Sequence, residues 1–500
     1  MCLATDLGMG FPFEHGLQAT LVTKRLCEAV GVDEDVLSPT YYACLLMYAG
    51  CTVDELERTA TFGGSMVEHH THRQFGTRIE SLSGVVRALQ SPEAALPRRA
   101  WQVVTGLPRA ARFIDGHVAA LCEVAGMLAE RLGMPESVHG IFPLLTERWD
   151  GKSILERASG DEIPLPLRII QVGRDAAYQR LIGDDDYVKE VIQSRAGKAF
   201  DPDVVATFIR NAGDILGPPD PPTTAWEDVL ASEPQPWLTL EGPAIERALR
   251  AMGAFSDLVS PYLLGHSSGV AELAGAAAEL GAFTDGEVKT IRRAGFVHDV
   301  GRTAVSSRIW NKPGPLTTDE RERARLHPYH TERVLARSPF LAEVSSVAMT
   351  HHERLDGSGY YRGLDVSSLS RASRLLAAAD AFQSKIEPRP YRDALSPEKA
   401  TEVLVDKAKA GAFDPAMVRI VAEAAGQTPP PIERRGGLTE REGEVVSLLA
   451  RGLQTKQIAH ELDISPKTVD RHIQNSYRKM GVSSRAAATL FATENGLVST

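Results

Sequence analysis

Apolar residues along this chain recur mostly three or four positions apart, within segments rich in Ala, Leu and Glu. Strand-like alternation of apolar and polar positions is scarce. Because apolar residues at this spacing share one face of a helix, the pattern predicts an all-α protein. Two proline clusters, Gly217–Pro222 and Gln427–Gly437, interrupt this helical pattern, which indicates linkers. The predicted order is a helical domain (1–215), a linker (216–243), a second helical domain (244–425), a linker (426–437) and a small domain (438–500).

The two long helical domains are related to each other in sequence. His15 pairs with His266 at an offset of 251 residues, and later segments pair at an offset of 206, which places about 45 extra residues inside the first copy. The sequence therefore predicts a tandem duplication. The pairs at an offset of 206 are Thr146–Gly151 with His352–Gly357 and Arg168–Ile170 with Arg374–Leu376, and Phe200–Pro202 then matches Phe413–Pro415 at an offset of 213.

Composition narrows the class of protein. The 500 residues are 43% hydrophobic and 24% charged, as in soluble globular proteins, and suffice for two to four domains. No apolar run could span a bilayer, and no basic residue precedes the apolar positions of Met1–Gly10, so we expect a cytoplasmic protein. Five cysteines without a CxxC pair argue against disulfides or a zinc knuckle. A net charge of −10 argues against coating nucleic acid but allows one small DNA-reading domain.

Histidine doublets and spaced partners concentrate in the second copy. Neighbouring helical residues point about 100° apart, so His298-Asp299 and His351-His352 suit two adjacent metal ions better than one. Imidazoles and carboxylates without cysteine favour iron, manganese or zinc. The pattern predicts a two-metal hydrolase that activates water against a phosphoester. The candidate ligands are His266, His298, Asp299, His327, His351, His352 and Asp380.

Residues 244–425 resemble the HD-GYP branch of the HD-domain phosphohydrolases. The resemblance rests on His298-Asp299 with Arg302, Asn311–Gly314, the run His351–Tyr361, Ala379-Asp380 and Arg389–Arg392. It implies a helical fold, a centre of two or three metals, and hydrolysis of cyclic dinucleotides, typically cyclic di-GMP. The seven candidate ligands match the family's positions, and Asp299 would bridge the ions.

The second copy departs from the family pattern at three positions. The Gly-Tyr-Pro motif is Gly359-Tyr360-Tyr361, and the lysine after His-Asp is Arg302, which differs from lysine in shape and reach. Tyr262 stands where members with three metals carry glutamate, so we expect two metals, Fe or Mn, with Zn as an alternative.

Substrate contacts follow from the same resemblance. Asp299 and Arg302 are the predicted catalytic residues, with Arg302 steadying a phosphate oxygen as charge builds. Gly359 and Tyr360 would form the substrate-binding edge, and Arg389 and Arg392 could clamp a second phosphate by bidentate hydrogen bonds.

The first copy has lost this ligand set. His15 alone keeps its place, whereas apolar residues, Thr146 and Arg174 occupy the other positions. Such residues cannot hold a dication, so we expect a degenerate domain that serves dimerisation or sensing. His69, His70 and His72, in the extra segment of the first copy, are interpreted as surface residues. The substituted positions are Met47, Tyr48, Leu121, Leu145, Thr146 and Arg174.

Residues 438–497 resemble a LuxR-type helix-turn-helix. Thr439 with Glu442 forms a capping box for a first helix, and Ser465-Pro466 begins a recognition helix that buries Val469, Ile473 and Met480. Eight basic and seven acidic residues after 437 leave a net charge of +1, so DNA affinity is expected to need a homodimer. Asp470 is expected to read a cytosine amino group. The predicted DNA contacts are Lys456, Lys467, Thr468, Arg471, Gln474 and Asn475.

Together these features predict a bacterial transcriptional regulator with a metal-dependent phosphodiesterase domain that acts on a cyclic dinucleotide. An alternative is a nucleotide- or metal-sensing transcription factor whose HD domains do not hydrolyse their ligand. The complete ligand set favours the enzyme, whereas Arg302 and the altered Gly-Tyr-Pro favour the sensor. A nucleotidase with an inconsequential tail is disfavoured by the intact recognition helix.

Overall fold

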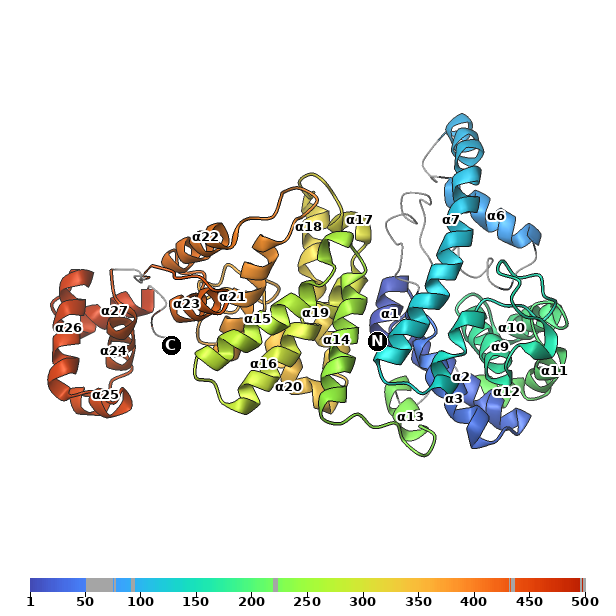
Figure 1. Ribbon diagram of the computed structural model, residues 1–500, viewed down its shortest axis with the longest axis horizontal. Coiled ribbons are helices and arrows are strands. Elements are labelled where there is room, and N and C mark those ends of the chain that lie inside the picture. Colours follow the sequence, from blue (N-terminus) through green and yellow to red (C-terminus); the bar gives the residue numbers. More distant parts are fainter. Residues whose placement is uncertain are drawn as a thin grey trace. The chain divides into compact units, whose positions relative to one another are not determined.

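The regular secondary structure of the described chain is helical (Figure 1). The computed structural model describes residues 1–50, 75, 78–90, 95–218, 224–430, 432, 437–494 and 497. Within them the only β-type pairing is a few isolated bridges, such as Asp356 with Asp365, which confirms the all-α prediction. None of the described helices is long and apolar enough to cross a membrane. His69, His70 and His72 lie outside the described residues.

The chain divides into two compact units. The first unit comprises Met1–Pro261 with Thr303–Asn311, and the second comprises Tyr262–Arg302 with Lys312–Thr500. Residues 216–257 therefore cluster with the first unit, so the predicted domain start at 244 stays a prediction.

In the first unit, α2 (His15–Val30) is the central helix and packs against α1, α3, α9 and α11 to α13. Its apolar face, including Val22 and Leu26, meets Ile169 and Val172 of α9 in one core cluster. The remaining elements are α1 (Cys2–Met9), α3 (Glu34–Leu46), α6 (Arg78–Leu89), α7 (Leu96–Arg131), α8 (Glu136–His139), η1 (Phe142–Leu144), η2 (Gly160–Glu162), α9 (Leu165–Gln179), α10 (Asp185–Arg195), α11 (Pro202–Arg210), α12 (Ala212–Leu216), α13 (Ala225–Ala231), α14 (Pro243–Asp257) and α17 (Ser307–Trp310).

In the second unit, α15 (His266–Leu280) is central and packs against α16, α21 and α23 (Figure 1). It is rich in alanine, and Ala271 approaches Gly295 of α16 so closely that a Cβ on this glycine would lie 2.5 Å from the Ala271 Cα. This contact brings the start of α15 beside the end of α16. The other elements are η3 (Pro261–Leu263), α16 (Asp285–Val297), η4 (Val300–Ala304), α18 (Thr318–Arg325), α19 (His327–Leu335), α20 (Pro339–Ala348), α21 (Arg371–Ile386), α22 (Pro397–Lys409) and α23 (Pro415–Ala424).

Several contacts occur in both units at the positions that the sequence alignment pairs. The amide of Trp149 donates to Ala199 O at 3.1 Å, and the amide of Leu355 donates to Ala412 O at 3.1 Å. An arginine pairs with the N-cap aspartate in each unit, namely Arg168 with Asp201 at 2.8 Å and Arg374 with Asp414 at 3.4 Å. Helices α2 and α15 both begin at the paired histidines, each after a residue in the left-handed conformation.

The last four helices enclose a separate hydrophobic core around Val445, Leu449, Ile458, Val469 and Ile473. A capping box at Thr439 begins α24, as predicted. The bounds are α24 (Glu440–Ala450), α25 (Thr455–Glu461), α26 (Pro466–Met480) and α27 (Arg485–Glu494).

Candidate metal centre

All seven predicted ligands gather in the interior of the second unit. Helix ends present most of them, because α15 and α19 begin at His266 and His327, while α16 ends just before His298-Asp299. His351 and His352 follow α20, and Asp380 lies within α21. Six of the seven side chains are buried, and that of His352 is 16% exposed.

The ligand atoms form two sets that meet at Asp299. His266, His298 and Asp380 make one group whose ligand atoms lie within 4.8 Å of one another, and His327, His351 and His352 make another. Asp299 Oδ2 lies 3.4 Å from His266 Nε2 and 2.9 Å from His298 Nε2. Its Oδ1 lies 3.3 Å from Nε2 of both His327 and His351. One carboxylate thus presents one oxygen to each group, as a bridging ligand does.

Three ligand histidines are oriented by backbone carbonyls one helical turn earlier. Nδ1 of His298, His327 and His351 lies 2.8, 2.6 and 2.7 Å from the carbonyl oxygens of Gly295, Ala324 and Ala348, respectively. A carbonyl only accepts, so each Nδ1 carries the proton and each Nε2 offers its lone pair to the centre.

His266 is oriented differently, by a carboxylate. Its Nδ1 lies 2.8 Å from Glu387 Oε2, and Glu387 is itself held by Gln383 Nε2 at 2.7 Å and Arg389 Nη2 at 2.9 Å. A carboxylate behind a metal-ligating imidazole fixes its ring and raises its basicity. Sequence reasoning missed Glu387, because no motif marks a residue that acts through another side chain.

The donor set fits two divalent cations. Nε2 of His266 and of His298, both oxygens of Asp299 and Oδ1 of Asp380 are buried without a well-directed hydrogen bond within the described residues. His327 Nε2 and His351 Nε2 face each other at 3.1 Å, an arrangement of two lone pairs that a cation would stabilise. Unsatisfied buried polar atoms are costly, and metal ions would satisfy these.

Asp299 and His351 have the charge states that metal ligation requires. Burial alone would raise the pKa of Asp299, but Arg302 and His298 hold this pKa well below its usual range. Burial lowers the pKa of His351 to about 4, which keeps its imidazole neutral. Neutral imidazoles and an ionised carboxylate are the forms that bind metals.

Arg302, a predicted catalytic residue, lies against the bridging carboxylate. Its Nη2 is 2.7 Å from Asp299 Oδ2, and its side chain is 7% exposed. To contact a phosphate bound at the metals, the Arg302 guanidinium would have to share or release the Asp299 carboxylate. Arginine and lysine are not interchangeable at such a position, because the planar guanidinium differs from an ammonium group in shape and reach.

The predicted substrate-binding edge is a loop fastened by Glu353. This buried carboxylate accepts from the amides of Arg362 at 2.8 Å and Leu364 at 2.9 Å. Gly359 is required by close packing, since a Cβ there would lie 2.5 Å from Glu353 Cα. Tyr360 covers the centre, with its ring centroid 4.7 Å from that of His352. The Arg325 guanidinium lies 4.9 Å from the centroid of the same Tyr360 ring.

The two arginines predicted to clamp a phosphate have partners within the protein. Arg389 donates to Tyr262 O at 2.7 Å and to Glu387, whereas Arg392 donates to Lys385 O and Glu387 O at 3.1 Å and also to Ser384 O. Arg392 therefore caps the carboxyl end of α21. A substrate contact by either residue stays a prediction.

The corresponding place in the first unit is filled by aromatic side chains. The Phe11 ring lies 4.6 Å from that of His15 and 5.1 Å from that of Tyr48. The buried Arg174 guanidinium lies 4.1 Å from the Tyr48 ring centroid. Neither ring nitrogen of His15 has a hydrogen-bond partner within the described residues. Burial, with Arg174 nearby, lowers the pKa of His15 to about 4.

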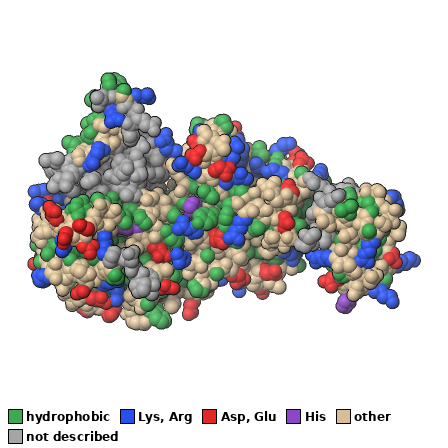
Figure 2. All heavy atoms as spheres, turned by 180° about the vertical axis from the view of Figure 1, so that it is seen from behind, with side chains coloured by type: hydrophobic (Ala, Val, Ile, Leu, Met, Phe, Trp, Pro, Cys, Tyr) green, Lys and Arg blue, Asp and Glu red, His purple; other side chains and the backbone are tan. Residues whose placement is uncertain are grey.

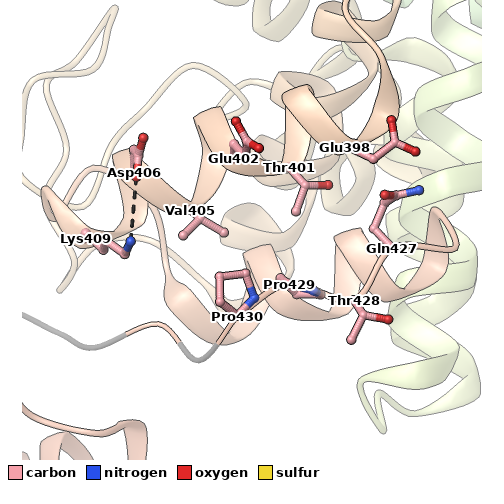
Figure 3. Close-up of a pocket in the computed structure, with 10 residues that line it drawn as sticks. All are labelled: Glu398, Thr401, Glu402, Val405, Asp406, Lys409, Gln427, Thr428, Pro429 and Pro430. Atoms are coloured by element: carbon pink, nitrogen blue, oxygen red, sulfur yellow. Dashed lines mark ion pairs between the residues drawn. The ribbon is translucent and has the colours of Figure 1, made fainter.

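A pocket of about 440 Å³ lies between α22 and the segment from Gln427 to Pro430 (Figure 3). Its lining includes Glu398, Glu402 and Asp406, but none of the predicted site residues. The pocket and the metal centre thus have no lining residue in common.

The recognition helix α26 has the predicted faces. Val469 and Ile473 are buried and Met480 is partly buried, while Lys467, Arg471 and Gln474 are exposed. Thr468 and Asn475 are partly exposed, and Lys456 of α25 is exposed. On the face drawn in Figure 2, basic and acidic side chains of this domain are interspersed.

Asp470 on this helix has a partner in the supporting helix. Thr455 Oγ1 donates to its carboxylate at 3.2 Å, which links α25 to α26. Asp470 therefore has a structural role in linking the two helices, and its contact with a cytosine amino group stays a prediction.

Comparisons with known proteins agree with both resemblances. The HD domain family matches residues 254–417, and the bacterial regulatory proteins of the luxR family match residues 437–492. The chain is 27% identical over 432 residues to 3'3'-cGAMP-specific phosphodiesterase 3 of Vibrio cholerae, covering 85% of this chain and 93% of that protein. It is 37% identical over 137 residues to a cyclic di-GMP phosphodiesterase of Thermotoga maritima, covering 27% and 37%, respectively. The crystal structure of the V. cholerae cyclic GMP-AMP phosphodiesterase V-cGAP3 matches with a TM-score of 0.57 at 25% identity, covering 86% of this chain and 97% of that one.

Proposed function

We propose that this chain, which joins an HD domain related to the HD-GYP cyclic-dinucleotide phosphodiesterases to a LuxR-type domain, is a transcriptional regulator. Its second unit hydrolyses a cyclic dinucleotide. The observation that carries the proposal is the position of Asp299, which presents one oxygen to each of two three-ligand groups. Two divalent transition metals, Fe or Mn, would supply the Lewis acidity for attack of water on a phosphodiester.

The protein's own residues prepare this reaction. Backbone carbonyls hold three imidazoles in the ligating tautomer, and Glu387 does so for His266. The Arg302 guanidinium, which pairs with Asp299, would stabilise negative charge that develops on the phosphate by sharing or exchanging this partner. The Tyr360 ring covers His352 and would limit access of bulk water. In the net reaction, water adds to one phosphodiester and one P–O bond breaks, which gives a linear dinucleotide.

The relatives support a cyclic dinucleotide as substrate. The relative from V. cholerae, which is named a 3'3'-cGAMP-specific phosphodiesterase, matches 85% of this chain, whereas the T. maritima relative is named for cyclic di-GMP. We propose cyclic di-GMP and 3'3'-cGAMP as the first candidates. Tyr361 replaces the family's proline at the edge of the site, which favours a mixed dinucleotide.

Chromatography of products tests the enzyme. Purified protein loaded with Fe or Mn is incubated with a panel of cyclic dinucleotides beside the Asp299→Ala variant. A linear product from wild type but not from the variant is the expected result.

The sensor alternative is favoured by one contact, the ion pair between Arg302 and the bridging Asp299. A guanidinium held there could leave the centre able to bind a ligand and unable to turn it over. Measurable binding of a cyclic dinucleotide, together with no product from any of them, would replace the enzyme by the sensor.

We further propose that the first unit is a degenerate duplicate without metal. The repeated Arg–Asp pair and the equivalent backbone hydrogen bonds support common ancestry. The rings around His15 and the guanidinium of Arg174 support the loss of metal binding. Its proposed role is to assemble a homodimer that pairs two DNA-binding domains.

A further inference from the structure

The Tyr360 side chain covers one of the two three-ligand groups of the metal centre. Its ring centroid lies 4.7 Å from that of His352 and 6.3 Å from that of His327. Both histidines belong, with His351, to what we call the second ligand group. The Tyr360 amide also donates to His352 O at 3.2 Å. Movement of the Tyr360 ring would therefore change the access of water and small molecules to the second ligand group.

A carboxylate on a neighbouring helix fastens the loop that carries Tyr360. Glu332 accepts a hydrogen bond from the Tyr361 hydroxyl, and its two oxygens lie 2.7 and 2.8 Å from Arg362 Nη2. Arg362 Nε also donates to the Tyr361 hydroxyl at 2.9 Å, which completes a network of three side chains. Glu332 lies on α19, the helix that begins at His327. The network thus ties the two residues after Tyr360 to the helix that presents a metal ligand.

Tyr361 is the best-placed donor of this network. The Arg362 side chain is 44% exposed, so solvent screens its ion pair with Glu332. The Tyr361 side chain is partly buried, and its ring centroid lies 5.6 Å from that of Tyr329. Burial and the hydrogen bond to Glu332 raise the pKa of Tyr361 to about 12, so the hydroxyl keeps its proton and donates. The proline that the family motif has at this position could not make this bond.

We propose that the hydrogen bond from Tyr361 to Glu332 is a latch that holds the Tyr360 ring over the second ligand group, which makes Tyr361 a positioning residue for the phosphodiesterase. The inference rests on the metal centre of the proposed function. The latch slows the passage of a metal ion to and from the second ligand group. It closes over the empty and the occupied group alike, so it changes the rates of metal binding and release by the same factor and leaves the affinity unchanged.

Tyr361→Phe in the full-length protein tests the latch, because this substitution removes the hydroxyl and keeps the ring. Release of Mn from the loaded protein into an excess of a coloured chelator gives the rate, and equilibrium titration against the same chelator gives the affinity. Glu332→Ala, alone and combined with Tyr361→Phe, completes a double-mutant cycle. Tyr329→Phe is the matched control, since within the described residues the Tyr329 hydroxyl has no hydrogen-bond partner although its ring contacts that of Tyr361.

We expect Tyr361→Phe to release one of its two metals about tenfold faster than wild type, the effect of losing one hydrogen bond to a charged acceptor. Its metal affinity and thermal stability should equal those of wild type. Glu332→Ala should accelerate release at least as much, and the double variant should release metal no faster than Glu332→Ala. Tyr329→Phe should release metal at the wild-type rate.

Three results would overturn the latch. The first is a wild-type release rate in Tyr361→Phe, and the second is an equal acceleration in Tyr329→Phe. The third is faster release with weaker equilibrium affinity, because Tyr361 would then support the ligands instead of covering them. The proposed function is judged separately: if wild type binds two metals but forms no linear product from any cyclic dinucleotide, the enzyme fails and the release rates still decide the latch. If wild type binds no metal, both proposals fail.

Discussion

At the residue scale, the metal centre depends on the acceptors behind its imidazoles. His298 and His351 use a carbonyl from the last turn of the helix that precedes them, and His327, which begins α19, uses Ala324 O of α18. His266, which begins α15, has a side chain as its acceptor instead. Glu387, 121 residues later, fills this role.

Glu387→Gln should therefore weaken metal binding. The amide keeps the size of the side chain but lowers the basicity of His266, and loss of such a partner costs about 10- to 100-fold in metal affinity. Metal per chain after equilibration with a graded chelator measures the change. Glu402→Gln, at an exposed residue of α22, is the control. Equal metal retention by both variants would show that Glu387 does not position the ligand.

His15 is a remnant whose removal should stabilise the first unit. Both ring nitrogens are buried without partners, so His15→Leu removes an unsatisfied polar group and should raise the free energy of unfolding by about 1 kcal/mol at neutral pH.

The stability gained by His15→Leu should increase as the pH falls. The folded pKa of about 4 lies below the usual 6.5, so the unfolded chain binds a proton first and wild type loses stability as the pH falls from 6.5 to 4. The advantage of His15→Leu should grow over that window. Denaturant unfolding of both proteins at pH 7, 5.5 and 4.5 measures it, and a constant difference would contradict a buried neutral histidine.

At the element scale, helices and their starts were the most predictable features. The capping boxes at Thr439 and the N-cap at Ser465 place α24 and α26 correctly, because their hydrogen bonds involve residues within three positions. Contacts between elements were harder. The bond from Thr455 to Asp470 and the cap of α21 by Arg392 depend on the packing of one helix beside another segment, which no local pattern encodes.

Different residues on the exposed face of α26 should contact the DNA backbone and the bases. Lys467→Ala and Arg471→Ala remove charges expected to lie on the backbone, so each should weaken binding to all sequences alike and reduce the salt slope by about 1. Gln474→Ala should instead reduce the difference in affinity between specific and non-specific DNA sites. Gel-shift titrations at several salt concentrations separate the two effects. A Lys467→Ala protein that loses discrimination at an unchanged salt slope would reverse the assignment.

At the scale of the whole molecule, the ligand set was readable because its residues are chemically distinctive and keep their order. The structure brings all seven together although they span 115 positions, from His266 to Asp380. The substrate contacts were harder to predict, since Arg389 and Arg392 fit a phosphate as well as the carbonyls and the carboxylate that they contact here.

The metal count should reflect the difference between the units. We expect two metals per full-length chain, both in the second unit, because within the described residues the two ligand groups lie in that unit. Substituting His298 and Asp299 together by alanine should remove most bound metal, since both ions lose a ligand. Elemental analysis after anaerobic reconstitution provides the number. Retention of two metals by the double variant would place them elsewhere.

The central claim is that two metals bridged by Asp299 make the second unit a phosphodiesterase. Titration of the metal-free protein with Mn, while linear product from cyclic di-GMP and 3'3'-cGAMP is followed by chromatography, tests it most directly. Product formation should rise mainly with the second equivalent of metal per chain and should be absent in Asp299→Ala. Two bound equivalents and a bound cyclic dinucleotide without any linear product would contradict the claim.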